Sequence, residues 1–170
     1  MSVLFTSDLH LGDNFVAQLR GFKSTQEHDD AVIESIVKVA TKRSHLWILG
    51  DLGGDLDSVK RLKDIQCQKK IMVAGNHDDF ATEEYLDIFD VVRGAVSYKN
   101  MWITHFPIHP TEFYYKLGNV HGHVHKPQKG TINDIPALGY PYLNVNWEYW
   151  GKPLQLENIK NEFILYKDGK

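Results

Sequence analysis

Cysteine is almost absent from this sequence, in which Cys67 is the one thiol among 170 residues. A single thiol excludes an internal disulfide and a zinc site built from several cysteines. Long apolar runs are missing too, since a membrane-spanning helix needs about 20 consecutive apolar residues. Residues 1–7 contain no basic stretch of the kind that begins a secretory signal. We therefore expect a cytoplasmic protein with no membrane partner.

A surplus of positive charge is also lacking. The chain has 19 Lys and Arg residues against 22 Asp and Glu residues, a formal net charge of −3 at pH 7. Proteins that bind nucleic acid without regard to sequence usually carry a basic surface, so we expect no broad nucleic-acid-binding surface. Hydrophobic residues make up 42% of the sequence, and a chain of this length can bury one core. We predict a single domain over residues 1–170.

Histidine, in contrast, is plentiful, with nine residues in the chain. Six of them lie in short clusters with Asp, Asn or Gly, namely His10, His77, His105, His121, His123 and His125. A random scatter over the surface would not group them in this way. The clusters indicate a site that uses imidazole groups.

The first half of the chain alternates predicted strands and helices. Three short β-rich runs each end in a polar motif: residues 2–7, 45–49 and 70–74. A capping box at 24–27 begins a predicted helix, and residues 57–65 are a second helix candidate. Strands that alternate with helices pair in parallel, and ligands collect at their carboxyl ends. The polar motifs are therefore expected to meet at one edge of a sheet.

The second half of the chain is predicted to be mostly β-structure. The expected strands are residues 91–98, 101–104, 118–121 and 142–147. Lys99-Asn100 is a predicted tight hairpin turn. Residues 153–170 fit either a helix or a closing strand.

Two motifs near the amino terminus offer carboxylates. Asp8-Leu9-His10 sets a carboxylate and an imidazole on the same side of an extended chain, where both can hold one ion. The alternative is a strand-end cap with a surface histidine. Gly50-Asp51 offers a carboxylate at a turn, and its two oxygens can bridge two cations. The alternative for Asp51 is a helix N-cap.

Three further motifs follow along the chain. Gly75-Asn76-His77-Asp78 offers an amide oxygen from Asn76 and a proton from His77, although a plain polar turn would have the same residues. His105 follows the strand 101–104 and fits a structural role as well as a ligand. Gly122-His123-Val124-His125 sets two imidazoles on one side of the chain, a pattern typical of metal sites.

Together these motifs provide carboxylate, amide and imidazole ligands. The candidates are Asp8, His10, Asp51, Asn76, His105, His123 and His125. They outnumber the ligands that one ion takes, and they suit two divalent ions that share a bridging carboxylate. Such a pair of ions is suited to cleaving a phosphate ester. We favour manganese, and the mixed ligands also suit iron, zinc, nickel or cobalt.

The five motifs, in this order, resemble the signature of the calcineurin-like metallophosphoesterase superfamily. The chain is similar in particular to short, capless bacterial and phage-type members, which share the block at 121–125 and the segment 144–148. The resemblance implies an α/β fold, a four-layer α/β/β/α sandwich of two mixed β-sheets flanked by helices. It assigns Asp8, His10 and His125 to one metal and Asn76, His105 and His123 to the other. It also implies two catalytic residues: Asp51 bridges the metals, and His77 is the general acid.

Two positions depart from the pattern of many relatives. An Asp followed by Arg or Tyr is common after the Gly-Asp pair, whereas here Asp55 precedes Leu56. Asp13 stands where many close relatives carry a second histidine. Both departures bear on substrate preference rather than on the core chemistry.

We expect a dinuclear phosphoesterase in which a hydroxide that bridges the metals attacks phosphorus and His77 protonates the leaving group. The absence of an inserted cap favours a diester, and a phosphomonoesterase or nucleotide phosphatase is the alternative. The expected partner is a small phosphate ester, a nucleotide or a nucleic-acid end. A catalytically silent interaction scaffold is the competing class, although such a protein would be expected to lose ligands that this chain keeps.

Other residues are candidates for supporting roles. Those that could position a ligand are Asp78, Asp79 and Glu148. Those that border the cleft, or simply close the core, are Phe15, Arg20, Phe22, Tyr114 and Tyr115. An aromatic group that suits either a dimer contact or the core comprises Tyr140, Tyr142, Trp147, Tyr149 and Trp150. The sequence leaves the oligomeric state open.

Overall fold

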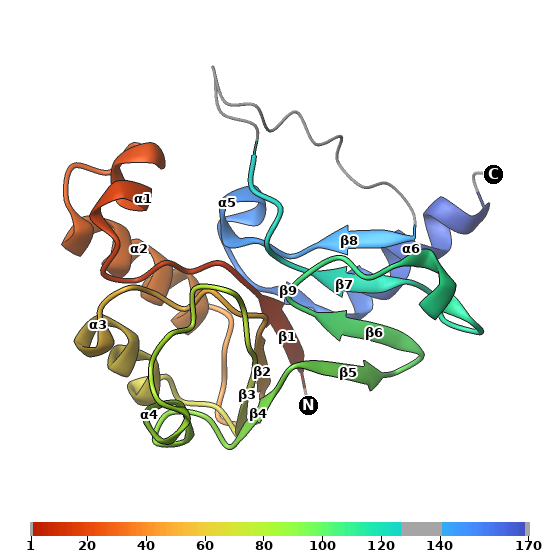
Figure 1. Ribbon diagram of the computed structural model, residues 1–170, viewed down its shortest axis with the longest axis horizontal. Helices are drawn as coiled ribbons and strands as arrows, with labels where there is room; N and C mark the ends of the chain where they lie inside the picture. The colour runs from red at the N-terminus through yellow and green to blue at the C-terminus, as the bar shows by residue number, and fades with distance from the viewer. Residues whose placement is uncertain (1, 127–140, 169–170) are drawn as a thin grey trace.

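A computed structural model of the chain describes residues 2–126 and 141–168. The first sheet has the strand order β4-β3-β2-β1-β9 (Figure 1). Its parallel strands are β1 (Val3–Thr6), β2 (His45–Ile48), β3 (Lys69–Val73) and β4 (Val91–Arg93). The short strand β9 (Leu154–Gln155) runs antiparallel to β1. The three predicted strands of the first half are confirmed, with their parallel pairing.

The second sheet has the order β5-β6-β7-β8. Its strands are β5 (Ala95–Tyr98), β6 (Met101–Thr104), β7 (Asn119–His121) and β8 (Tyr142–Asn144). β5 and β6 pair antiparallel, and β6, β7 and β8 pair in parallel. Lys99 and Asn100 join the hairpin with φ values of 48° and 65°, as a two-residue turn with both residues left-handed requires. The predicted hairpin turn is confirmed.

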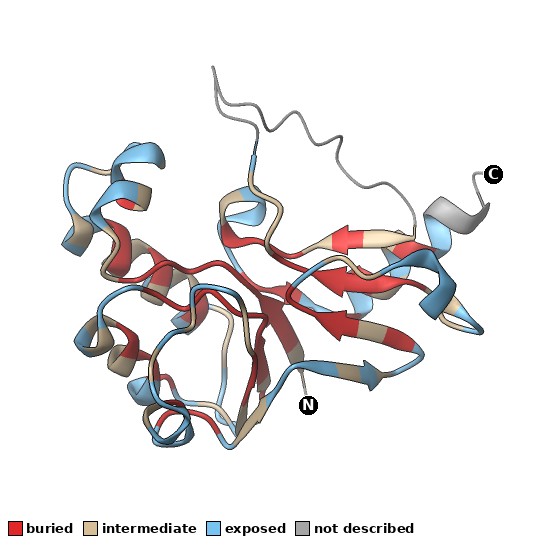
Figure 2. Ribbon diagram, viewed as in Figure 1, coloured by how far each residue is buried: buried red, intermediate tan, exposed pale blue. Residues whose placement is uncertain are grey.

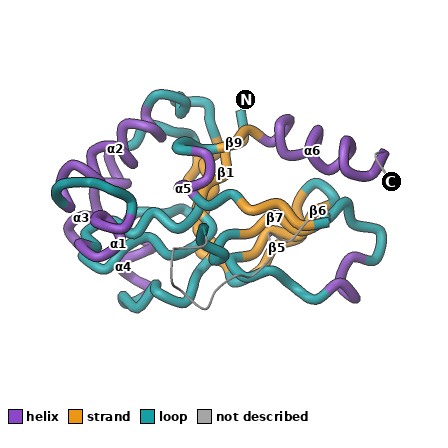
Figure 3. Tube along the Cα trace, turned by 90° about the horizontal axis from the view of Figure 1, so that it is seen from above, coloured by secondary structure: helices purple, strands orange, loops and turns teal. Residues whose placement is uncertain are grey.

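Helices flank the two sheets. They are α1 (Asn14–Leu19), α2 (Thr25–Val37), α3 (Leu56–Lys60), α4 (Thr82–Leu86), α5 (Trp147–Trp150) and α6 (Leu156–Asp168), with 3-10 turns η1 (Arg61–Asp64) and η2 (Pro110–Phe113). Figures 1 and 3 show α1 to α4 on one side of the first sheet and the second sheet on the other. The predicted α/β fold with two mixed sheets flanked by helices is confirmed. The assignment of residues 1–170 to a single domain stays a prediction.

Local signals explain where α2 begins. The Ser24 hydroxyl accepts a hydrogen bond from the Glu27 N–H at 3.1 Å, which satisfies one of the unpaired N–H groups at the helix start. The Glu27 carboxylate accepts from the Lys23 N–H at 2.8 Å rather than from Ser24 itself. The capping box therefore begins the helix as predicted, with its return bond shifted by one residue. The second helix candidate, 57–65, forms α3 followed by η1.

Three predicted boundaries change in the structure. Residues 91–98 do not form one strand, because the chain leaves the first sheet after β4 and enters the second as β5, with Gly94 between them. The predicted strand 142–147 ends at Asn144, and Asn146 caps α5 by accepting from the Glu148 N–H at 3.0 Å. Residues 154–168 contain both alternatives, the short strand β9 and then α6.

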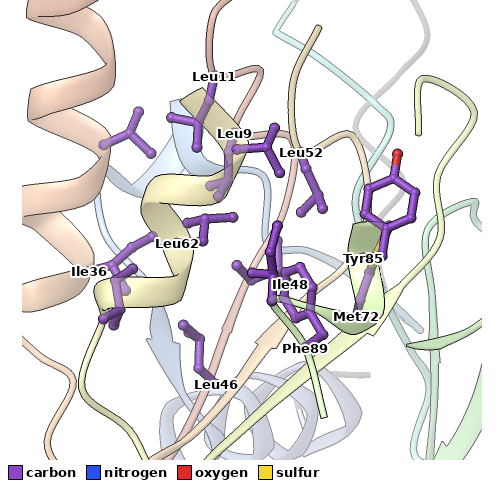
Figure 4. Packing of buried hydrophobic residues seen from close by; sticks show 14 of the residues in the cluster. Leu9, Leu11, Ile36, Leu46, Ile48, Leu52, Leu62, Met72, Tyr85 and Phe89 are labelled. Atoms are coloured by element: carbon purple, nitrogen blue, oxygen red, sulfur yellow. The ribbon is translucent and has the colours of Figure 1, made fainter. Parts of the chain in front are cut away.

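Side chains that alternate along the strands feed two separate cores. Leu4, Leu46 and Met72 point to the helices and belong to one buried cluster. Figure 4 shows Leu46 and Met72 in this cluster with Leu62, Tyr85 and Phe89. Phe5, Trp47 and Ile71 point the other way and pack with Ile103 and Val120 of the second sheet. Figure 2 shows β1, β6 and β7 largely buried, whereas β5 at the edge of the second sheet is exposed or half-buried. The first sheet is thus fixed on both faces, which holds the ends of its strands in place.

No helix in residues 2–126 and 141–168 is both long and apolar enough to span a membrane.

Candidate metal centre

The polar motifs of both sheets meet at the carboxyl ends of parallel strands. Asp8 and His10 follow β1, Asp51 follows β2, and Asn76 and His77 follow β3. His105 follows β6, and His123 and His125 follow β7 in the second sheet. Because the two sheets pack face to face, residues more than 100 positions apart come to one place. The backbone N–H of His123, for example, donates to the Asp8 carboxylate at 3.0 Å.

The structure brings all seven predicted ligand residues together. One group contains potential ligand atoms of Asp8, His10, Asp51 and His125 that all lie within 4.8 Å of one another. A second group contains Asp51, His105 and His123 under the same limit. The Asn76 side-chain oxygen lies 3.0 Å from His105 Nε2 and so joins the second group. Asp51 belongs to both groups.

The unpaired atoms of the site suit cations. His10 Nε2 is buried and has no hydrogen-bond partner within the described part of the chain. His105 Nδ1 donates to the Leu49 carbonyl at 2.7 Å, so in the neutral ring the lone pair is on Nε2. That lone pair faces the Asn76 side-chain oxygen and, at 3.5 Å, Asp51 Oδ1. Three acceptors facing one another repel unless a proton or a cation lies among them. Burial alone would lower the pKa of His105, but Asp51 and Asp8 raise it, so a proton on Nε2 can fill this role in the metal-free protein. A divalent ion can take the place of that proton.

The charges of the buried groups are mutually dependent. Burial raises the pKa of Asp8 to about 6, against the opposing effect of the His105 and His125 charges. Burial alone would raise the pKa of Asp51 as well, but hydrogen bonds from His105 and the His77 N–H lower it to about 2. Burial and the charge of Arg20 lower the pKa of His10 to about 4. His10 and Asp51 are thus held in the neutral and anionic forms that bind metals, whereas a bound cation would have to offset the cost of the buried Asp8 charge.

Four of the seven candidate ligands have left-handed backbone angles. The φ values are 55° for Asp8, 51° for His10, 53° for Asp51 and 66° for His123. Non-glycine residues held there cost about 1–3 kcal/mol each and cluster at functional sites. A Cβ on Gly75 would collide with Asp51 Oδ1, and one on Gly122 would collide with Asp8 Oδ2. These glycines let one ligand loop approach another closely.

Asp78 supports the loop that carries Asp51. Its carboxylate accepts hydrogen bonds from the N–H groups of Asp51 at 3.0 Å, Leu52 at 2.9 Å and Gly75 at 2.7 Å. These bonds connect the ends of β2 and β3. Asp78 therefore acts on the backbone of a candidate ligand, and among the described residues no hydrogen bond or ion pair joins it to an imidazole.

Glu148 and Arg20 link His125 to the loop that carries Asp8. Glu148 Oε2 lies 3.3 Å from His125 Nδ1 and 3.7 Å from Arg20 Nε. The guanidinium donates to the carbonyls of Asp8 at 2.7 Å and Leu9 at 3.1 Å. A carboxylate on the far nitrogen of a ligand imidazole fixes its orientation and raises its basicity. Arg20 borders the cleft as predicted, but its Nη groups are committed to the protein backbone rather than free for a phosphate.

The sequence interpretation missed a buried pair beneath this loop. His28 Nδ1 lies 2.9 Å from Asp29 Oδ1, and the Asp29 carboxylate accepts from the Gly12 N–H at 3.0 Å. His28 Nε2 also contacts Arg20 Nη1 at 2.9 Å. A signal for His28 was present, because it stands four and eight residues before Val32 and Ile36 on the buried stripe of α2.

A cleft of about 1040 Å³ opens beside the two ligand groups. His10, His77, His123 and His125 line one part of it, and Phe15, Arg20 and Phe22 line another. Asp13 also lines the cleft and caps α1, since its carboxylate accepts from the Val16 N–H at 3.0 Å. Asp55 caps α3 through the Ser58 N–H at 2.8 Å. Both departures from the family pattern therefore have helix-capping roles.

The other predicted aromatic residues have varied positions. Tyr114 and Tyr115 are 79% and 87% exposed and are not among the described residues that line the cleft. Trp147 is buried in the core of the first sheet and its helices. Tyr149 and Trp150 are partly exposed. Tyr140 lies outside the described residues.

Comparisons with known proteins agree with this geometry. The sequence model of the calcineurin-like phosphoesterase family matches residues 1–164. Gene 66 protein of Mycobacterium phage L5 is 31% identical over 80 residues, which are 44% of this chain and 38% of that protein. The chain thus matches well under half the length of this curated relative.

A solved structure supports the fold. The protein of unknown function AQ665 from Aquifex aeolicus superposes with a TM-score of 0.72 at 23% identity, over 94% of this chain and 98% of that one. At this identity the likeness concerns the fold alone. The family match over nearly the whole chain is the decisive finding. The chain belongs to the calcineurin-like phosphoesterase family.

Proposed function

We propose that this phosphoesterase holds two divalent metal ions and hydrolyses a phosphate diester. The observation that carries the proposal is the pair of ligand groups that share Asp51 beside one cleft. Asp8, His10, Asp51 and His125 would hold one ion. Asp51, Asn76, His105 and His123 would hold the other. When bound, two such ions lower the pKa of water to near neutrality and neutralise phosphate charge.

His77 is the proposed general acid. Its backbone N–H donates to Asp51 Oδ1 at 2.9 Å, which fixes the residue next to the proposed bridging ligand. Its imidazole lines the cleft, with the ring centre 5.9 Å from that of His10. A protonated imidazole at this position would donate its proton to the oxygen of the departing alcohol. Asp51 would act as a catalytic residue because it belongs to both ligand groups and would hold both metal ions.

The charges around the cleft favour a diester. Among the described residues, three carboxylates line the cleft, from Asp13, Asp79 and Glu148, against two cationic side chains, Arg20 and Lys126. A phosphate monoester carries up to two negative charges near neutral pH and a diester carries one, so these acidic groups repel the monoester more strongly. A phosphomonoesterase or nucleotide phosphatase is the alternative, and a catalytically silent scaffold is a further one. We propose manganese as the metal, and the mixed oxygen and nitrogen ligands also suit iron, zinc, nickel or cobalt.

The test uses metal-stripped protein with manganese, zinc or nickel added back. Hydrolysis of bis(p-nitrophenyl) phosphate and of p-nitrophenyl phosphate is followed by release of the same chromophore. Asp51→Asn should abolish turnover and His77→Ala should reduce it by about 10²–10⁴-fold. Asp64→Asn and His45→Ala are controls, because Asp64 is exposed on η1 and His45 stands at the opposite end of β2. A faster monoester reaction would favour the alternative, and binding of two ions without turnover would favour the scaffold.

A further inference from the structure

Two large apolar side chains on α1 face the same cleft as the proposed metal ligands. Phe15 is 68% exposed and Leu19 is 45% exposed. They stand four residues apart and so lie on one face of the helix. Both line the cleft together with His77 and His125. Exposed apolar groups on a convex surface are common, but in a concave site next to polar groups they mark a ligand-binding wall.

The short helix α1 is held firmly against the rest of the site. Asp13 caps its start, and Ala17 is fully buried beneath it. At its end the Arg20 N–H donates to the Val16 carbonyl at 3.0 Å, while the Arg20 guanidinium donates to the Asp8 carbonyl. The apolar wall is therefore connected directly to the loop that carries the proposed ligands. A wall that is already in place loses little entropy when a ligand binds.

Two of the charged groups near this wall, the Arg20 guanidinium and the Glu148 carboxylate, pair with each other at 3.7 Å. The Asp13 carboxylate is used as a helix cap. Phe15, Val16 and Leu19 thus present hydrocarbon to the cleft between these paired groups. A charged or strongly hydrated group would gain little from these side chains, and a flat apolar group would remove one face from water by packing against them.

We propose that Phe15 and Leu19 form a subsite for an aromatic ester group of the phosphate substrate. The inference rests on the proposed function, because the metal centre would hold the phosphoryl group while α1 holds the ring. An aromatic occupant fits best because the Phe15 ring can stack on it, and contacts between a planar ring and an aromatic side chain are tolerant of ring identity. The substrate class is therefore an aryl or heteroaryl phosphate ester.

Binding of phenylphosphonate and methylphosphonate to the manganese-loaded protein tests the subsite without requiring turnover. The two probes share the phosphonate and differ in the ring, and calorimetry gives the ratio of their dissociation constants. We expect phenylphosphonate to bind about tenfold more tightly, which corresponds to about 1.4 kcal/mol. Phe15→Ala and Leu19→Ala should each lower this ratio at least threefold. Because both side chains are exposed, neither substitution leaves a cavity in the core.

Leu86→Ala is the matched control, since Leu86 is 54% exposed on α4 and is not among the described residues that line the cleft. It should leave the ratio unchanged. Equal binding of the two probes to the unmodified protein, or a ratio that survives both α1 substitutions, overturns the subsite. Self-association of the loaded protein that Phe15→Ala abolishes also overturns it, because the wall would then contact a second copy. If the protein binds phenylphosphonate more tightly than methylphosphonate but hydrolyses no ester, only the proposed function is refuted. If it hydrolyses esters but binds both probes equally, only the subsite is refuted.

Discussion

Asp8→Asn should stabilise the metal-free protein although it removes a proposed ligand. Asp8 is fully buried, and burial raises its pKa from 3.8 to about 6. An acid whose pKa is raised on folding favours the folded state only while it is protonated. Between about pH 4 and pH 6 the Asp8 carboxyl is mostly ionised in the unfolded chain but mostly protonated in the folded chain. The free energy of unfolding therefore falls as the pH rises through this range. Above pH 6 the full cost is present.

The magnitude follows from the size of this shift. About two pKa units correspond to about 3 kcal/mol at neutral pH. The Asp8 carboxylate accepts the His123 N–H with both oxygens, and an asparagine keeps one of these acceptors, a loss of about 1 kcal/mol. A net gain of about 2 kcal/mol remains. For a chain of this size it should raise the melting temperature by about 4–8 °C.

Thermal unfolding in a chelator at pH 7.5 and at pH 4 provides the assay. The gain should be present at pH 7.5 and nearly vanish at pH 4, where the folded Asp8 is protonated. Manganese should stabilise the unmodified protein and have a smaller effect on Asp8→Asn. An unchanged or lower melting temperature for the variant at pH 7.5, or an equal gain at both pH values, would refute the reasoning.

Further expectations concern the neighbouring groups and the metal. Asp51→Asn should have the opposite effect and lower the melting temperature in chelator, because the Asp51 pKa is lowered to about 2 by its partners; a gain like that of Asp8→Asn would contradict this. Glu148→Gln should weaken binding of one of two ions by about 10–100-fold in calorimetry, since Glu148 orients His125, whereas two unchanged sites would exclude that role. Asp78→Ala should lower the free energy of unfolding by about 3 kcal/mol in urea, because three backbone N–H groups lose their acceptor; an effect under about 1 kcal/mol would show that water replaces it. Manganese at 100 times its dissociation constant should stabilise the unmodified protein by about 2.7 kcal/mol per site, and no shift in melting temperature would count against a metal site in the folded state.

Motif order and strand periodicity alone gave a correct account of β1, β2 and β3, the three central strands of the first sheet. A polar residue that directly follows a β-rich run lies at the carboxyl end of that strand. A helix between two such runs makes the strands parallel, so their carboxyl ends lie on the same side of the sheet. Asp8, Asp51 and Asn76 were therefore placed at one edge without any knowledge of the tertiary structure. The turn at Lys99-Asn100 was equally predictable, because two residues separate two β-rich runs there and Asn100 is of a type that tolerates left-handed angles.

Gly94 marks the limit of such local reasoning. β-branched or apolar residues continue on both sides of it, so the periodicity of 91–98 describes extended chain correctly. It carries no information on which sheet each half joins. That choice depends on the side chains that cover each face: Val92 packs against the helical core and Val96 against the core between the sheets.

The sequence by itself thus determined which side chains could bind metals, because ligand chemistry belongs to the residue type. Only the tertiary structure decided their arrangement. It placed His125 against Glu148, gave Asp8, His10, Asp51 and His123 left-handed backbones, and used Arg20 to fasten a loop. Local propensities describe how a segment prefers to fold, whereas these contacts depend on the packing of two sheets, which holds strained loops and buried charges in positions that no short segment would adopt alone.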